Sequence, residues 1–193
     1  MQIREARRGD AAAVASLART AWHAAYGDFL SAEAIDATVD AWYDPSELRR
    51  DISGDGTFLV ADADAASHGD EQESAVSAAD SDDADDASLV GFGHARYSSG
   101  VGNVVLRRLY VHPDEWGCGV GTALLGELAR RFRADGHSRL SAVVLAENDV
   151  GLSFYDSHAF EEIGRQTTSF AGEEHDECIV AASLADLTDL GPV

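Results

Sequence analysis

The chain of 193 residues contains no lysine, and its 14 basic residues, all arginines, are outnumbered by 35 acidic ones. A Walker A nucleotide loop requires a Gly-Lys-Ser/Thr sequence, so the absence of lysine excludes that kind of phosphate site. The net charge of −21 leaves no basic patch that would displace counterions from a phosphate backbone. We therefore expect no nucleic-acid partner.

Cysteine is also scarce, because Cys118 and Cys178 are the only two and lie far apart in the sequence. They form neither a disulfide framework nor a metal-binding pair, and the seven histidines show no ligand spacing, so no metal is expected. The sequence also lacks a signal-peptide core and any apolar run of membrane-spanning length. These features predict a cytoplasmic protein with no membrane partner, since a reducing compartment keeps cysteines unpaired.

The acidic residues are spread along the chain, and the lysine-free composition resembles that of proteins from salt-in halophiles. A dense carboxylate surface stays hydrated in molar salt, where charge repulsion is screened. The alternative interpretation is that the negative charge attracts cationic substrates. Residues 62–88 hold almost only Ala, Asp, Glu, Ser, Gly and Gln, and this composition predicts a mobile acidic insert because too little apolar surface is buried. The remainder predicts a single domain over residues 1–193.

The segment LYVHPDEWGCGVGTALL, residues 109–125, joins an expected strand to a glycine-rich loop and an expected helix. Pro113 ends the strand because it has no N–H group to donate. Gly117, Gly119 and Gly121 follow at every second position and let backbone N–H groups approach a ligand at a helix N-terminus. Unpaired amides and the positive end of the helix dipole favour an anion such as phosphate.

This loop differs from a dinucleotide fingerprint, G-x-G-x-x-G, because its third glycine falls one position early, at Gly121. The stretch Trp116-Gly117-Cys118-Gly119-Val120-Gly121 instead resembles the acetyl-CoA pyrophosphate loop, Q/R-x-x-G-x-G/A, of the GNAT superfamily of N-acetyltransferases. A second segment, ENDVGLSFYDSHAF over residues 147–160, is similar to the Asn, small residue and Phe-Tyr that follow the fifth strand of that family. The opening residues 3–30 also resemble its first strand and helices.

The resemblance implies the GNAT fold, which is an α/β fold with a mixed, mostly antiparallel seven-stranded sheet flanked by helices. Its fourth and fifth strands splay apart. The hydrophobic periodicity and turn residues of this chain place the elements in the order that this fold requires. We expect strands over 2–6, 57–61, 89–97, 103–111, 139–145, 162–170 and 177–184, with the last two joined around Gly172, and helices after Asp10, Ser31 and Asp44 and over 120–134 and 149–157.

The resemblance also implies the donor site. Backbone groups of Leu109, Tyr110 and Val111 would pair with the pantetheine arm of acetyl-CoA, and the pyrophosphate would rest on the loop and its helix. The full expected set is Leu109, Tyr110, Val111, Trp116, Gly117, Cys118, Gly119, Val120, Gly121, Thr122, Asn148 and Tyr155. Trp116 departs from the family pattern, which has Arg or Gln there, so a side-chain donor is missing. Trp116 either packs on the rim or stacks on the ligand.

In the implied chemistry an amine attacks the thioester carbonyl directly, the Val111 amide polarises that carbonyl, and Tyr155 protonates the departing thiolate. Asn148 either contacts the cofactor or a water, or simply caps its helix. The general base is not identified: the candidates are His94, Tyr97, Arg108, Tyr110 and Glu33, with His112 as a weaker one. Arg130, Arg131 and Arg133 either contact the ribose phosphate or are solvated helix residues.

The sequence therefore predicts an acetyl-CoA-dependent N-acetyltransferase that acts on a primary amine of a small molecule. Two alternatives remain: a protein N-terminal or lysine acetyltransferase, and a non-catalytic module that binds acyl-CoA. Cys118 has no evident histidine partner, so we interpret it as filler in the loop rather than a covalent nucleophile. The sequence leaves open whether the chain forms a homodimer.

Overall fold

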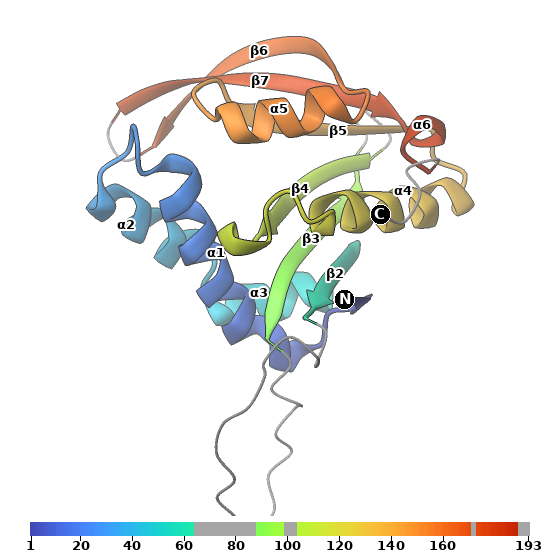
Figure 1. Ribbon diagram of the computed structural model, residues 1–193, viewed down its shortest axis with the longest axis horizontal. Coiled ribbons are helices and arrows are strands. Elements are labelled where there is room, and N and C mark those ends of the chain that lie inside the picture. Colours follow the sequence, from blue (N-terminus) through green and yellow to red (C-terminus); the bar gives the residue numbers. More distant parts are fainter. Residues whose placement is uncertain (64–87, 99–103, 171–172, 189–193) are drawn as a thin grey trace, which may run out of the picture.

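The computed structural model describes residues 1–63, 88–98, 104–170 and 173–188. Its strands form one seven-stranded sheet in the order β1-β2-β3-β4-β5-β7-β6 (Figure 1). All neighbouring strands are antiparallel except β4 and β5, which are parallel. This arrangement confirms the predicted fold class. The strands are β1 (Gln2–Glu5), β2 (Thr57–Asp62), β3 (Leu89–Tyr97), β4 (Val104–Val111), β5 (Arg139–Leu145), β6 (Glu161–Phe170) and β7 (Glu173–Ser183).

Helices cover both faces of the sheet and bury two apolar cores. The helices are α1 (Ala11–Tyr26), α2 (Ala32–Trp42), α3 (Pro45–Ile52), α4 (Val120–Ala134), α5 (Asp149–Ser157) and α6 (Leu184–Thr188), with short 3-10 turns η1 (Arg8–Asp10) and η2 (Pro113–Glu115). On one face α1, α2 and α3 pack against β2 and β3 around Val14, Ile35 and Phe92. On the other face α4 buries the stripe formed by Leu124, Leu125 and Leu128. Apolar residues at helical spacing produce such stripes.

A β-bulge divides β4 at Arg107. In the ladder with β3, His94 faces Arg108 and Ala95 faces Leu106, so Arg107 is the extra residue. An extra residue bends its strand and interrupts pairing. The parallel ladder between β4 and β5 accordingly covers only Val104 to Leu106. Beyond the bulge the two strands separate, and the splay expected between the fourth and fifth strands therefore has a local cause that the sequence does not reveal.

Several predicted boundaries were wrong. β7 begins at Glu173 rather than at residue 177, and Leu184 starts α6 instead of ending the strand. Asp10 directly precedes α1, as the sequence predicted, but its carboxylate does not cap the helix and instead accepts the Arg7 amide and the guanidinium of Arg4. A carboxylate that is already held by an arginine and an upstream amide is not oriented to accept the first amides of the helix.

Some expectations fall outside the described residues. These are residues 64–87 of the predicted acidic insert, Asn103 at the start of the fourth strand, and Gly172 in the last turn. Trp42 at the end of α2 is half exposed, whereas Ile35 and Val39 on the same helix are buried. Within the described ranges, no helix combines the length and the apolar character needed to cross a membrane.

Candidate active site

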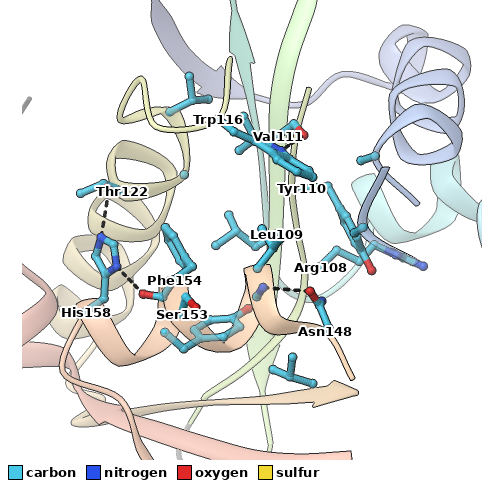
Figure 2. Close-up of a pocket in the computed structure, with 18 of the residues that line it drawn as sticks. Arg108, Leu109, Tyr110, Val111, Trp116, Thr122, Asn148, Ser153, Phe154 and His158 are labelled. Carbon is cyan, nitrogen blue, oxygen red and sulfur yellow. Dashed lines mark hydrogen bonds between the residues drawn. The ribbon is translucent and has the colours of Figure 1, made fainter. Parts of the chain in front are cut away.

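A cavity of about 550 Å³ occupies the gap that opens where β4 and β5 separate. Residues of β4, the loop after it, the first turn of α4, β5, α5 and the end of α1 line this cavity (Figure 2). Its volume lies within the range of about 300–1,000 Å³ that is typical of small-ligand sites. The cavity therefore joins segments that are far apart in the sequence.

One wall of the cavity is the free edge of β4. The His112 amide donates to Val90 on the β3 side at 2.8 Å, whereas the Val111 carbonyl accepts the Trp116 indole N–H at 3.0 Å. Backbone groups of successive strand residues point to opposite sides. The N–H and C=O groups of Leu109 and the N–H of Val111 therefore face the gap, where no strand among the described residues pairs with them.

The glycine loop lies at one end of this edge, and its glycines have two different reasons for being glycine. Gly117 and Gly119 adopt left-handed backbone conformations, with φ of 77° and 84°, which side chains disfavour. Gly121 lies inside α4, where an added Cβ would come within 3.1 Å of the Phe154 ring. The first two glycines shape the loop, and the third lets α4 approach α5.

The N-terminus of α4 opens at the cavity without a side-chain cap. Its N-cap residue is Gly119, which makes no side-chain hydrogen bond, and the first internal bond runs from the Ala123 amide to the Gly119 carbonyl at 2.9 Å. The preceding amides of Val120, Gly121 and Thr122 have no partner within the helix. Together with the helix dipole, these amides favour an anion at this position.

Trp116 and Cys118 have structural contacts in this loop. The Trp116 indole is fixed by its hydrogen bond to Val111, so it ties the loop to the end of β4 while its ring remains 38% exposed at the cavity. Cys118 is exposed, does not line the cavity, and donates its amide to the Glu115 carbonyl at 3.2 Å. The other eleven residues of the expected donor site do line the cavity, and Cys118 is the exception.

Helix α5 supplies Asn148 and Tyr155. The side-chain oxygen Oδ1 of Asn148 accepts the Gly151 amide at 2.8 Å and thereby caps α5. The side-chain nitrogen Nδ2 of Asn148 donates to the Tyr26 hydroxyl at 3.3 Å. A Cβ on residue 151 would meet Asn148 Nδ2 at 2.7 Å, which explains the small residue after the asparagine. The Asn148 side chain is thus committed to capping and to Tyr26, although it also borders the cavity.

Tyr155 presents a phenol to the cavity between the rings of Phe154 and Phe160, whose centroids lie 5.5 and 4.9 Å away. Among the residues that the structure describes, nothing forms a hydrogen bond with the Tyr155 hydroxyl. Burial, with a smaller contribution from Tyr26, raises the pKa of Tyr155 well above its usual range. The hydroxyl therefore stays protonated at neutral pH and is free to donate.

Sequence reasoning missed Tyr26, which lies at the end of α1 and closes the cavity beside Tyr110. The two hydroxyls are 3.5 Å apart, and burial raises the pKa of Tyr26 to about 12. Burial also raises the pKa of Tyr110 well above its usual range, so neither phenol is a base at neutral pH. Ala21 and Ala25 also line the cavity, and these two small residues one turn apart were the only sign in the sequence that this face of α1 borders a cavity.

His158 also escaped the sequence analysis. Its Nδ1 lies 2.7 Å from the Phe154 carbonyl, which only accepts, so this nitrogen carries the proton (Figure 2). The other nitrogen, Nε2, then accepts the Thr122 hydroxyl at 2.8 Å. This pair links the first turn of α4 to the end of α5, at the end of the cavity that the glycine loop borders.

The structure separates the candidate bases. Arg108 and Tyr110 line the cavity, whereas His94, Tyr97, Glu33 and His112 do not. His94 is buried against the Phe58 ring, and burial together with the positive charge of Arg108 lowers its pKa to about 4. His112 accepts the Asp114 amide, and Glu33 and Tyr97 are exposed elsewhere.

The three arginines of α4 do not reach the cavity. Arg130 and Arg131 both pair with Glu127, and Arg133 donates to the Thr188 hydroxyl at 2.6 Å. These contacts favour the interpretation of solvated helix arginines. Within the described residues, no group of three His, Cys, Asp or Glu side chains is placed to hold a metal ion.

The sequence and structure were compared with known proteins. No relative was found among curated protein sequences. Solved structures of similar fold include an N-acetyltransferase, PaiA, from Thermoplasma acidophilum in complex with coenzyme A, which is 23% identical, with 94% of this chain and 98% of that chain covered and a TM-score of 0.72. A GCN5-related N-acetyltransferase from Rhodopseudomonas palustris is also 23% identical, covers 94% of both chains and has a TM-score of 0.69.

A third structure is the ribosomal-protein-S18-alanine N-acetyltransferase from Escherichia coli, at 17% identity, with 95% of this chain and 93% of that chain covered and a TM-score of 0.63. At these identities the likeness establishes the fold alone. The model of the acetyltransferase (GNAT) family, however, matches residues 31–160, which span the segment from α2 through the glycine loop to the end of α5. The chain therefore belongs to the GNAT family of acetyltransferases.

Proposed function

We propose that the chain transfers an acetyl group from acetyl-CoA to a primary amine of a small molecule, by direct attack in a ternary complex. One observation carries the proposal: the uncapped N-terminus of α4 and the free edge of β4 border the same cavity. An anion site joined to an unpaired strand edge suits a ligand that has a pyrophosphate at one end and an amide-containing arm at the other.

The donor would bind along β4. The amides of the Gly117–Thr122 loop would hold the pyrophosphate, and the gap-facing groups of Leu109 and Val111 would pair with the pantetheine arm as a neighbouring strand would. Backbone donors carry most of this recognition. The tryptophan at position 116, in place of Arg or Gln, therefore need not abolish binding.

The chemistry requires a carbonyl donor and a proton for the leaving sulfur. The amine nitrogen would attack the thioester carbon while the Val111 amide stabilises the oxyanion. The carbon–sulfur bond then breaks, and the thiolate takes the proton of the Tyr155 hydroxyl. The extra proton on nitrogen leaves to water, and the Tyr155 phenolate regains a proton from water, so no net proton is gained or lost. The raised pKa of Tyr155 bears on this role only by keeping the phenol protonated at neutral pH, so that its proton is present when the thiolate leaves.

The size of the cavity supports a small acceptor. The volume of about 550 Å³ must take the pantetheine arm as well, which leaves room for a small amine beside Tyr26 and Tyr110. A protein N-terminus is the rival acceptor. For a protein acceptor, residues after the N-terminal one should contribute to affinity, whereas a small-molecule acceptor has no such residues.

Calorimetric titration tests the donor site first. Acetyl-CoA should bind saturably in about molar KCl, whereas ATP should not, and free CoA should bind with similar affinity because it keeps the same pyrophosphate. An amine screen that detects released thiol then follows, with free amines compared against peptides. A folded protein that binds neither acetyl-CoA nor CoA contradicts the proposal, and a preference for peptides transfers it to protein acetylation.

We further propose that this is a single domain with an acidic insert, working at high salt in the cytoplasm. The net charge of −21 and the two free cysteines support this setting. Screening of carboxylate repulsion should make the free energy of unfolding rise between low salt and molar KCl. Stability that does not change with KCl, measured by denaturant unfolding, would argue against adaptation to salt.

A further inference from the structure

Two arginines line the cavity at the bulge of β4, and they differ in their partners. Arg108 is held by Asp51 at 2.5 Å, donates to the Trp42 carbonyl at 3.2 Å and lies over the Tyr43 ring. Arg107 lines the cavity too, yet no carboxylate in the described part of the chain pairs with it. Arg107 is therefore a cavity cation whose charge the fold leaves uncompensated.

The surroundings of Arg107 make this end of the cavity electropositive. The Arg107 side chain is exposed, but desolvation still lowers its pKa, and repulsion from Arg96 and Arg108 lowers it further, while Asp51 offsets only part of this effect. The net charge of the chain is −21, so carboxylates for pairing are abundant elsewhere. The only carboxylate on the described cavity lining is Glu115, which lies in η2 beside the glycine loop.

Position along β4 assigns this charge to the acceptor rather than to the donor phosphates. The phosphate-binding amides follow β4, whereas Arg107 precedes Leu109 by two residues and Val111 by four, or about 7 and 13 Å of extended strand. The anion site for the pyrophosphate and the Arg107 guanidinium thus lie at opposite ends of the strand edge. The thioester would sit between them.

We infer that the acceptor is an amino acid, whose carboxylate pairs with Arg107 while its amine faces the thioester. This inference rests on the proposed acetyltransferase function. A guanidinium matches a carboxylate through two parallel hydrogen bonds, so it selects a planar anion in a defined orientation. An amino acid carries both the amine that would attack the thioester and the carboxylate that would pair with Arg107. The positive charge at the same place opposes polycationic amines.

Transfer to matched acceptors tests the inference. The twenty amino acids, their uncharged α-carboxamides and O-phosphoethanolamine are assayed by thiol release from acetyl-CoA, with the wild-type protein and with Arg107→Gln. The control is Arg96→Gln, which removes an equal charge from β3 at a residue that does not line the cavity. Titration with acetyl-CoA is run on all three proteins, so that loss of donor binding is recognised separately.

The wild-type protein should prefer at least one amino acid over its carboxamide by about tenfold to a hundredfold in kcat/KM, as expected for a charge-assisted contact. Arg107→Gln should abolish this preference with unchanged acetyl-CoA affinity, and Arg96→Gln should keep it. Carboxamides accepted as well as the acids, a preference that survives Arg107→Gln, or a preference for O-phosphoethanolamine would each overturn the amino-acid assignment while leaving the acetyltransferase function intact. A protein that acetylates no amine overturns both.

Discussion

Replacing Tyr155 by phenylalanine removes one oxygen atom and separates catalysis from structure. The Tyr155 ring keeps its packing between Phe154 and Phe160, and no described residue loses a hydrogen bond. The free energy of unfolding should therefore change by less than about 0.5 kcal/mol. The affinity for acetyl-CoA should also stay the same, because the hydroxyl is needed only when the thiolate leaves.

The rate is expected to fall much more than the stability. General acid catalysis contributes about 10²- to 10⁴-fold, so Tyr155→Phe should raise the barrier by about 3–5 kcal/mol. Rapid mixing with detection of the first equivalent of thiol measures the chemical step apart from product release. A first turnover within about threefold of the wild-type rate would refute the assignment of Tyr155 as the acid.

Tyr26→Phe is the matched control, because it removes the same atom from a phenol that does have a partner. The Asn148 Nδ2 atom donates to Tyr26, and its loss leaves a buried donor unsatisfied at a cost of about 1–3 kcal/mol. For a chain of this size each kcal/mol lowers Tm by about 2–4 °C. Tyr26→Phe should therefore lower the free energy of unfolding, whereas Tyr155→Phe should leave it nearly unchanged.

Three further predictions concern the loop, the α5 cap and acid stability. Gly117→Ala and Gly136→Ala both force alanine into a left-handed conformation with open space around Cβ, so each should lower stability by about 1–2 kcal/mol. Only Gly117→Ala should also weaken acetyl-CoA binding in calorimetry. If both variants bound acetyl-CoA with the same affinity, the role of the loop would be contradicted. Gly151→Ala should not stabilise the native chain, because its Cβ would meet the Asn148 side chain, but it should stabilise an Asn148→Ala variant by about 1 kcal/mol in denaturant unfolding. If the effects of the two substitutions on the free energy of unfolding were additive, the contact between residue 151 and Asn148 would not be tight. Burial raises the pKa of Asp10, but bonds from Arg4 and the Arg7 amide outweigh it and leave that pKa below its usual value. Asp10→Asn should therefore cost stability at neutral pH, and this difference should shrink as the pH falls below about 4; a difference that persists in acid would contradict the pairing.

The glycine loop shows how much of the local structure the neighbouring residues determine. Its strand, loop and helix were predicted correctly because Pro113, the spaced glycines and the apolar helix pattern each act through neighbouring backbone. The reason for Gly121 was different from the one expected, since this residue makes room for Phe154 from another helix. Likewise, aspartate is a residue type that favours helix N-caps, but the Asp10 carboxylate pairs with Arg4 on β1 instead of with the helix amides.

The sequence alone determined the family resemblance, the order of the elements and the strand–loop–helix around the spaced glycines, because these depend on propensities and spacings within about twenty residues. Only the tertiary structure decided which side chains meet at the cavity. The bulge at Arg107 needs the register of β3 against β4, and the Tyr26–Asn148 contact joins residues 122 positions apart. Such contacts depend on how two surfaces fit together in space, and a pattern along one chain does not specify that fit.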